Sequence, residues 1–153
     1  MPSIKPFLWF DTQAEEAARF YTSVFPNSKV TNVAHYGPEG SVMIVEFDLD
    51  GQSFAALNGG PVHYTFNESI SFEVDCADQA EVDAYWEKLT ADGGEPGPCG
   101  WLKDKYGVSW QIVPVALPGL LADPDPETSG RVQQALLQMS KIDIKALEDA
   151  HRG

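Results

Sequence analysis

Apolar and polar positions alternate with two different periods along the chain, and the change of period predicts a strand followed by a helix near the N-terminus. Residues 4–10 have the pattern of a strand. Thr12 and Glu15 then have the spacing of a capping box, and apolar residues follow at helical spacing. After this helix, residues 42–49 alternate again, and Asp50-Gly51 is a strong hairpin turn before a returning strand.

The second half of the chain has the same succession of patterns. Residues 69–76 predict a strand, Asp78 and Glu81 have the capping-box spacing, and Gly93-Gly94 ends the helix that follows. Residues 100–115 then supply two further strands around a turn. The two halves are therefore similar in their local signals.

Two short sequence matches support an ancient duplication. Gln13-Ala14-Glu15 recurs as Gln79-Ala80-Glu81, and Asp48-x-x-Gly51-x-Ser53-Phe54 recurs as Asp104-x-x-Gly107-x-Ser109-Trp110. The offset falls from 66 (79 − 13) to 56 (104 − 48), so the first copy carries about ten extra residues between its helix and its last hairpin. We expect an α+β fold of two βαβββ modules, at about 1–60 and 67–118, joined by a Gly/Pro-containing linker.

Residues 119–153 lie outside the duplication and predict a C-terminal helical extension. Val132, Leu136 and Met139 mark one amphipathic helix over about 129–141, and Asp143 can cap a last short helix. Two interpretations remain open for this extension. It is either a packing appendage of the domain, or a contact surface in a homodimer, which we expect as the assembly.

Composition limits the classes of partner. The chain has 153 residues, 43% of them hydrophobic, and a net charge of −13. Nucleic acids and anionic membranes need a basic face, so neither is expected as a partner. The charge favours solubility, and a cationic ligand is the alternative interpretation. Because nothing marks export and the two cysteines, Cys76 and Cys99, make no disulfide framework, we expect a cytoplasmic protein.

Three segments together resemble a known family. They are Ile4–Asp11, Gln13–Tyr21 and, most specifically, Cys99–Pro114, and the tail from Arg131 to Leu147 extends the likeness over nearly the whole chain. These segments resemble the PhnB-like, 3-demethylubiquinone 3-methyltransferase-like branch of the vicinal oxygen chelate superfamily, which includes glyoxalase and bleomycin-resistance proteins. The resemblance implies two modules whose curved mixed sheet encloses a cavity.

Enzymes of that superfamily usually hold a divalent metal on the first and last strands of each module, but the matching positions here lack ligands. Residues 3–8 and 69–72 contain no His, Asp, Glu or Cys. The usual carboxylate position falls on Gln111, and its counterpart is Ala55. We therefore expect no metal and no other cofactor. His63 and Glu46 could build a different site, although a histidine in the linker is more simply explained as solvated.

The resemblance and strand alternation suggest residues that line the cavity and bind a small aromatic or amphipathic molecule. Gln111 should face the cavity, and Trp110 should face the flanking helix. For the aromatic residues, core packing is the competing interpretation. The ligand-binding candidates are Trp9, Phe54, Asn58, Phe66, Ser71, Cys99, Trp101 and Gln111.

Three functions remain open from the sequence. The first is small-molecule binding without a metal, as in bleomycin-resistance proteins. The second is an enzyme, either a lyase, an isomerase or the named methyltransferase, although the chain has no glycine-rich strand-to-helix loop for an adenosyl cofactor. The third is a structural role in assembly. Cys99 is either a packed thiol or a nucleophile, which would need a nearby base.

Overall fold

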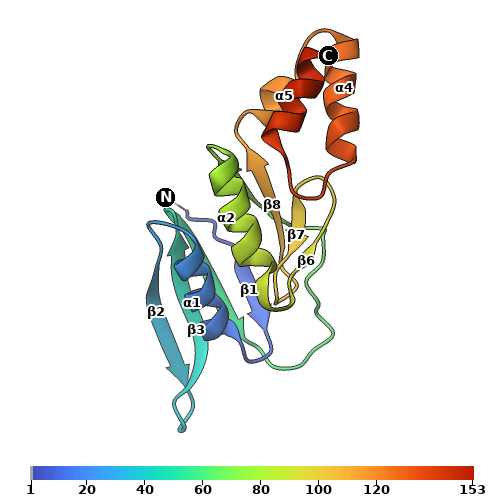
Figure 1. The fold of residues 1–153 in the computed structure, drawn as a ribbon. Helices are drawn as coiled ribbons and strands as arrows, with labels where there is room; N and C mark the ends of the chain where they lie inside the picture. Colours follow the sequence, from blue (N-terminus) through green and yellow to red (C-terminus); the bar gives the residue numbers. More distant parts are fainter. Residues whose placement is uncertain (1) are drawn as a thin grey trace. The chain divides into compact units, whose positions relative to one another are not determined.

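The computed structural model of the protein describes residues 2–153, and the chain divides into two compact units, Met1–Tyr64 and Thr65–Gly153. Each unit contains a four-stranded mixed sheet with a helix packed against it (Figure 1). The predicted α+β class with two βαβββ modules is therefore confirmed. The sheets are two separate four-stranded sheets, and the unit boundary lies inside the predicted linker.

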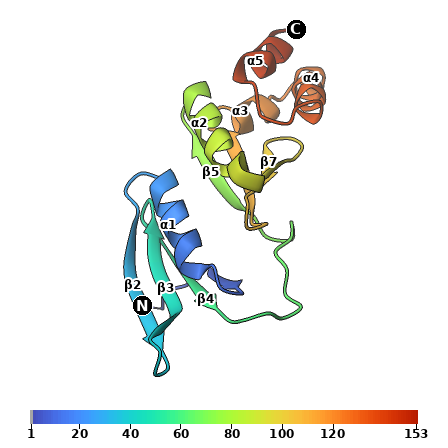
Figure 2. The same ribbon diagram turned by 60° about the horizontal axis from the view of Figure 1, so that its bottom comes forward.

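The first unit carries its helix on one face of the sheet β1-β4-β3-β2, in which the β1–β4 pair is parallel (Figure 2). Tyr21 of the helix stacks on Phe47, with ring centroids 6.3 Å apart, and Phe47 stacks on Phe54 at 5.4 Å. The elements are β1 (Phe7–Phe10), α1 (Ala14–Val24), β2 (Lys29–Tyr36), β3 (Ser41–Leu49) and β4 (Gln52–Asn58).

The second unit repeats this topology in the sheet β5-β8-β7-β6, again with a parallel first pair. Its strands β6 and β7 are much shorter than β2 and β3, which accounts for the ten extra residues expected in the first copy. The elements are β5 (Phe72–Cys76), α2 (Gln79–Thr90), a 3₁₀ turn η1 (Ala91–Gly93), β6 (Glu95–Pro96), β7 (Trp101–Lys103), β8 (Ser109–Pro114), α3 (Leu117–Leu121), α4 (Pro126–Leu137) and α5 (Ile144–Arg152).

The two expected capping boxes have different outcomes. In α2 the box forms, because Asp78 accepts from the Glu81 N–H at 2.9 Å and Glu81 accepts from the Ala77 N–H at 2.8 Å. At α1 the prediction is wrong, because the N-cap residue is Gln13 rather than Thr12, and its side chain makes no capping hydrogen bond. Instead, Asn58 at the end of β4 accepts a hydrogen bond from the Ala14 N–H at 2.8 Å.

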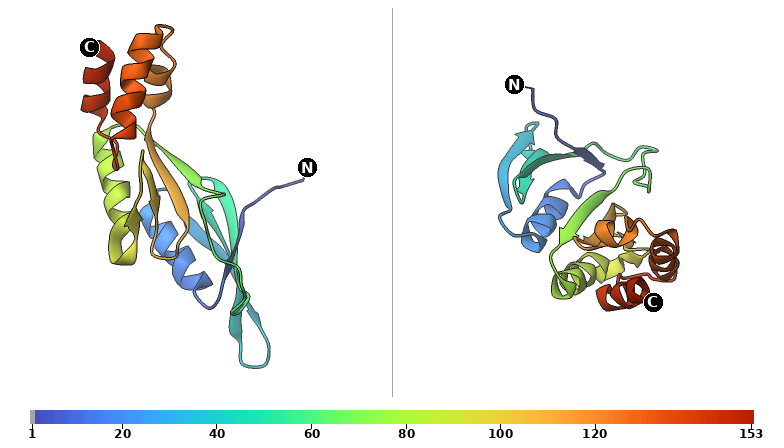
Figure 3. Two further views of the ribbon diagram at one scale, coloured as in Figure 1. Left: turned by 90° about the vertical axis from the view of Figure 1, so that its right-hand side faces the viewer. Right: turned by 90° about the horizontal axis from the view of Figure 1, so that it is seen from above.

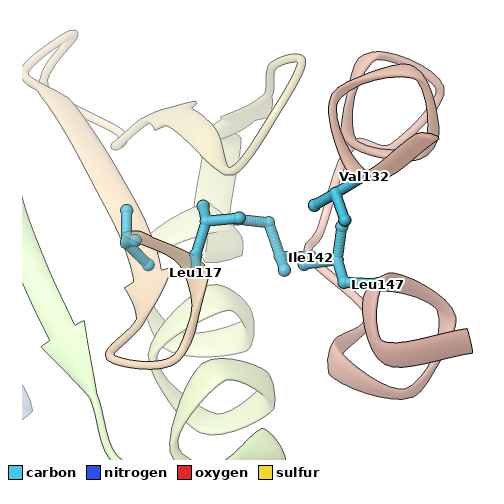
Figure 4. Close-up of a cluster of buried hydrophobic side chains, with 5 residues drawn as sticks. Leu117, Val132, Ile142 and Leu147 are labelled. Atoms are coloured by element: carbon cyan, nitrogen blue, oxygen red, sulfur yellow. The ribbon is translucent and has the colours of Figure 1, made fainter. Parts of the chain in front are cut away.

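The C-terminal extension forms a helical layer within the second unit. α4 and α5 lie side by side (Figure 3), and Asp143 caps α5 as expected. Val132, Ile142 and Leu147 are fully buried in one cluster with Leu117 and Val113 (Figure 4). Leu136 and Met139 pack against this cluster.

This packing supports a packing role for the apolar positions of the extension. Val132 is fully buried, and Leu136 of α4 and Met139, just beyond the helix, pack against the same cluster. The apolar stripe is therefore packed against other residues of the same unit. No helix within residues 2–153 has both the length and the apolar content that crossing a bilayer requires.

Candidate functional site

The second unit has an open pocket of about 500 Å³ beside the β6–β7 strands. Its walls are mostly apolar, formed by prolines, Trp101 and the loop that joins β6 to β7, and its polar groups are few. Such a combination is typical of sites for small molecules. The lining residues are Glu68, Glu95, Pro96, Gly97, Pro98, Cys99, Trp101, Leu102, Lys103 and Ser109.

Ser109 is one of the lining residues of this pocket, and it is a buried polar residue. The residue is only 1% exposed, and among the residues that the structure describes its hydroxyl has no hydrogen-bond partner. A buried hydroxyl without a partner costs folding free energy, on the order of 1–3 kcal/mol. Such groups are rare in native proteins and point to a missing partner.

The equivalent serine of the first unit has a partner. Ser53 lies directly across the β3–β4 pair from Asp48, and its hydroxyl donates to the Asp48 carboxylate at 2.9 Å. The aromatic residue that follows, Phe54, pairs with Phe47 on the helix side of the sheet. In the first copy of the motif, the serine hydroxyl therefore has a hydrogen-bond partner within the motif itself.

In the second unit the same motif is shifted by one residue. Trp110 pairs with Leu102, so Lys103 rather than Asp104 lies opposite Ser109. Asp104 is displaced into the longer loop, where it is 2% exposed and accepts from the Trp110 indole N–H at 2.9 Å. The sequence match of Asp48 with Asp104 is therefore not a structural equivalence. The shift removes the carboxylate that would have satisfied Ser109.

The charged residues at the pocket are two carboxylates and one ammonium group. Lys103 forms an ion pair with Glu68, and Glu95 is its cross-strand neighbour on β6. The hydrogen bond between Lys103 and Glu68 raises the pKa of Lys103 and lowers the pKa of Glu68. The pocket thus carries a net negative charge at neutral pH.

Five of the eight predicted ligand-binding residues lie in the second unit. Trp101 and Cys99 line the pocket itself. Gln111 is the cross-strand partner of Trp101, so both project from the same face of the sheet, and its amide donates to the Ser71 hydroxyl at 2.9 Å. Phe66 lies beside the loop at Gly107. Of the five, only Cys99 and Trp101 are among the residues that line the pocket.

The other three candidates lie in the first unit and have structural partners there. The Trp9 indole donates to the Gly60 carbonyl at 3.2 Å, and its ring meets Tyr64 edge-on at 5.2 Å. Phe54 is buried against the helix, and Asn58 caps α1. Their positions favour packing and capping roles in the first unit.

Two residues of this region were missed from the sequence. Ser109 belongs to the second repeat match, but only the register shift identifies its hydroxyl as unsatisfied. Glu73 lies one residue beyond the ligand window 69–72, and it is the parallel partner of Gln111. Burial, with a smaller contribution from Asp75, raises the pKa of Glu73.

The paired βαβββ modules define the fold of the vicinal oxygen chelate superfamily. The sequence profile of the 3-demethylubiquinone-9 3-methyltransferase family matches residues 2–113, and the chain belongs to this family. The PhnB protein of Bacillus cereus, provisionally described as a 3-demethylubiquinone-9 3-methyltransferase, is 34% identical, with a TM-score of 0.67 over 74% of this chain and 100% of its own.

Two more distant structures share the fold. Protein PA1353 of Pseudomonas aeruginosa is 17% identical, with a TM-score of 0.63 over 74% of this chain and 98% of its own. A fosfomycin resistance protein of Listeria monocytogenes, FosX, is 16% identical, with a TM-score of 0.56 over 77% of this chain and 94% of its own. No functionally curated protein matches significantly.

The donor groups of this chain do not fit the divalent metal expected of metal-dependent members of the superfamily. At the carboxylate position, Gln111 presents an amide whose nitrogen is bonded to Ser71, and Ala55 holds the corresponding place in the first unit. Glu73 is the one carboxylate paired with Gln111. Within residues 2–153, no three His, Cys, Asp or Glu side chains converge as a metal site would require.

Proposed function

We propose that this protein binds a small aromatic or amphipathic molecule in the pocket of the second unit, without a metal ion. The observation that carries the proposal is that Ser109 lines the pocket and that its buried hydroxyl has no partner among the described residues. A ligand with one polar group and a flat apolar body would complete that hydrogen bond and pack against Trp101.

Lys103 lies directly opposite Ser109 on β7, and both residues line the pocket. The Ser109 hydroxyl is closed off from bulk solvent, whereas the Lys103 side chain is 36% exposed. We propose that Lys103 swings aside with its partner Glu68 when the ligand enters. The exchange is inexpensive because an exposed ion pair contributes only about 0–1 kcal/mol.

The charge of the pocket narrows the ligand class. Glu68 and Glu95 outnumber Lys103, so an anionic ligand would be repelled. A neutral or cationic molecule fits the site, and the hydrogen bond to Ser109 can run in either direction because a hydroxyl both donates and accepts.

The test combines native mass spectrometry of the purified full chain with titration of Nile red, a neutral, flat aromatic dye whose fluorescence rises in apolar sites. Native mass spectrometry should reveal a copurified small molecule. We expect Trp101→Ala and Ser109→Ala to weaken Nile red binding several-fold. Ser53→Ala is the matched control, because the same motif position in the first unit is already bonded to Asp48.

The outcomes separate the proposal from nonspecific dye binding. Equal Nile red affinity in the parent and all three variants would show that the dye binds elsewhere, and would overturn the assignment of this pocket. A loss that is confined to Trp101→Ala and Ser109→Ala supports it.

A second candidate is the methyl transfer that gives the family its description. The apolar pocket is compatible with a flat, amphipathic quinone ring, which is the observation in its favour. Appearance of a methylated product from S-adenosylmethionine and a demethylated quinone, abolished in Trp101→Ala, would establish this activity in place of simple binding.

A cytoplasmic location and a homodimer remain proposals for this chain. Because the apolar stripe of α4 is already buried, the dimer is supported only by analogy within the superfamily. Light scattering at micromolar concentration should give twice the mass of the chain, and the mass of a single chain would contradict the dimer.

A further inference from the structure

One wall of the pocket is a loop in a conformation that needs external support. Residues Gly97, Pro98 and Cys99 line the pocket, and the chain then turns at Gly100 into β7. Cys99 has a φ of 57°, a left-handed conformation that disfavours residues with a Cβ, and Gly100 has a φ of 85°. Such backbone persists where surrounding contacts hold it.

Those contacts come from the C-terminal extension, at the end of α4 and just beyond it. The Cys99 N–H donates to the Met139 carbonyl, and the Gly100 N–H donates to the Ser140 carbonyl, both at 2.8 Å. The Ser140 hydroxyl donates to the Gly97 carbonyl at 2.6 Å, and the Cys99 thiol donates to the Leu136 carbonyl at 3.5 Å. Every residue from Gly97 to Gly100 except Pro98 is therefore bonded to the extension.

The supporting segment is itself fixed to the core. Ile142 is fully buried in the cluster with Val132 and Leu147 (Figure 4). Gln79, at the start of α2, donates to the Ile142 carbonyl at 3.0 Å and accepts from the Ile144 N–H at 2.8 Å. A Cβ at Gly100 would lie 2.7 Å from the Ile142 Cδ1 atom. The loop and the extension are thus in direct, close contact.

The family profile ends at residue 113, so this support is supplied by chain outside the matched region. We propose that the segment Leu136–Ile142 is a positioning element of the ligand site, with Ser140 as its positioning residue. It holds Cys99 and Gly100 in their left-handed conformation, fixes the Gly97–Gly100 loop and thereby sets ligand affinity. The first half of the proposal, that the extension holds the loop in place, concerns the loop alone. The second half, that the loop sets ligand affinity, rests on the proposed binding function.

Alkylation of Cys99 by iodoacetamide tests the first half without any ligand. Cys76 serves as an internal reference, because it is fully buried and burial raises its pKa to about 12. In the full chain, Ser140→Ala should raise the rate of Cys99 alkylation about fivefold, the effect of losing one net hydrogen bond on the population of the opened loop. Ser140→Thr, which keeps the hydroxyl, should restore the rate.

Ser129→Ala is the matched control in the same extension. Its hydroxyl donates to the Pro126 carbonyl at 3.4 Å, away from the pocket, so its Cys99 alkylation rate should equal that of the parent. Ile142→Val is a second, milder perturbation of the anchor, and it should also accelerate Cys99. Unchanged Cys99 rates in both Ser140→Ala and Ile142→Val would overturn the proposal. Equal acceleration of Cys76 and Cys99 would also overturn it, because that result signals general unfolding.

Nile red affinity measured on the same variants tests the second half. Weaker binding in Ser140→Ala, restored in Ser140→Thr, supports control of affinity by the extension, and unchanged binding overturns that control. If Cys99 responds as expected but Nile red binds equally to the parent, Trp101→Ala and Ser109→Ala proteins, the binding function fails while the positioning of the loop stands. The two failures are therefore distinguishable.

Discussion

Replacing Ser109 by alanine should stabilise the ligand-free protein, which is an unusual outcome for a buried position. The side chain is 1% exposed, and its hydroxyl has no partner within the described chain. An unsatisfied buried hydroxyl costs about 1–3 kcal/mol, and alanine removes the polar atom while keeping nearly the same volume. Because the small space that is left costs part of the gain, we expect a net increase of about 1 kcal/mol in the free energy of unfolding.

The assay is urea unfolding followed by circular dichroism, with thermal unfolding as a second measurement. A gain of 1 kcal/mol corresponds to a rise in Tm of about 2–4 °C for a chain of this size. Ser53→Ala is the paired control. It should lower the free energy of unfolding by at most about 1 kcal/mol, because it deletes the exposed hydrogen bond to Asp48. The two serines of the repeat should therefore respond with opposite signs.

The result that would refute this reasoning is a loss of more than about 1 kcal/mol in Ser109→Ala. Such a loss would mean that the hydroxyl has a strong partner in the folded protein. A bound ligand would also reverse the sign, so the measurement is made on protein whose native mass equals that of the bare chain. Adding the ligand should then stabilise the parent protein more than the variant.

Three further predictions follow from other parts of the second unit. Gly100→Ala should lower the free energy of unfolding by about 1–3 kcal/mol, because its Cβ would lie 2.7 Å from Ile142 and its φ is 85°. Gly119→Ala is the control and should not lower it, because the space around Gly119 is open. Equal urea midpoints for both variants would contradict the tight packing at Gly100. Glu73→Gln should stabilise the protein at pH 7, because the pKa of Glu73 is raised above 4.5 in the folded state and ionisation of its carboxyl group therefore opposes folding. The gain in stability should vanish below about pH 4, where the carboxyl group is protonated in both the folded and the unfolded state. A gain that persists below about pH 4 would have another cause. Elemental analysis of protein purified without chelators should show no stoichiometric zinc, nickel, manganese or iron, and a metal that is lost in Gln111→Ala would refute the metal-free interpretation.

The modular architecture could be predicted from the sequence because its signals are local. The Asp78–Glu81 capping box, the Asp143 cap and the Asp50-Gly51 turn each depend on a few neighbouring residues, and each forms as expected. The two repeat matches likewise indicated two copies of one unit. The change of offset between them located the longer β2–β3 hairpin of the first copy.

Other features depended on partners that are distant in the sequence. Thr12 and Glu15 satisfy the local rule for a cap, but Asn58 accepts from the Ala14 N–H from the end of β4 and caps the helix instead. The sequence of α4 predicts the same apolar stripe whether that stripe packs against another chain or against its own domain. Only the packing of Val132 against Ile142 and Leu147 decided between these alternatives.

The site shows the same division between sequence and tertiary structure. The sequence singled out Cys99, Trp101 and Gln111 as candidates, and it contained Ser109 in the repeat without giving it a role. A shift of one residue in the β7–β8 pairing placed Lys103 opposite Ser109 and moved Asp104 beneath Trp110. Register is set by loop length and by burial across the whole sheet, so whether the Ser109 hydroxyl would be satisfied was decided only by the tertiary structure.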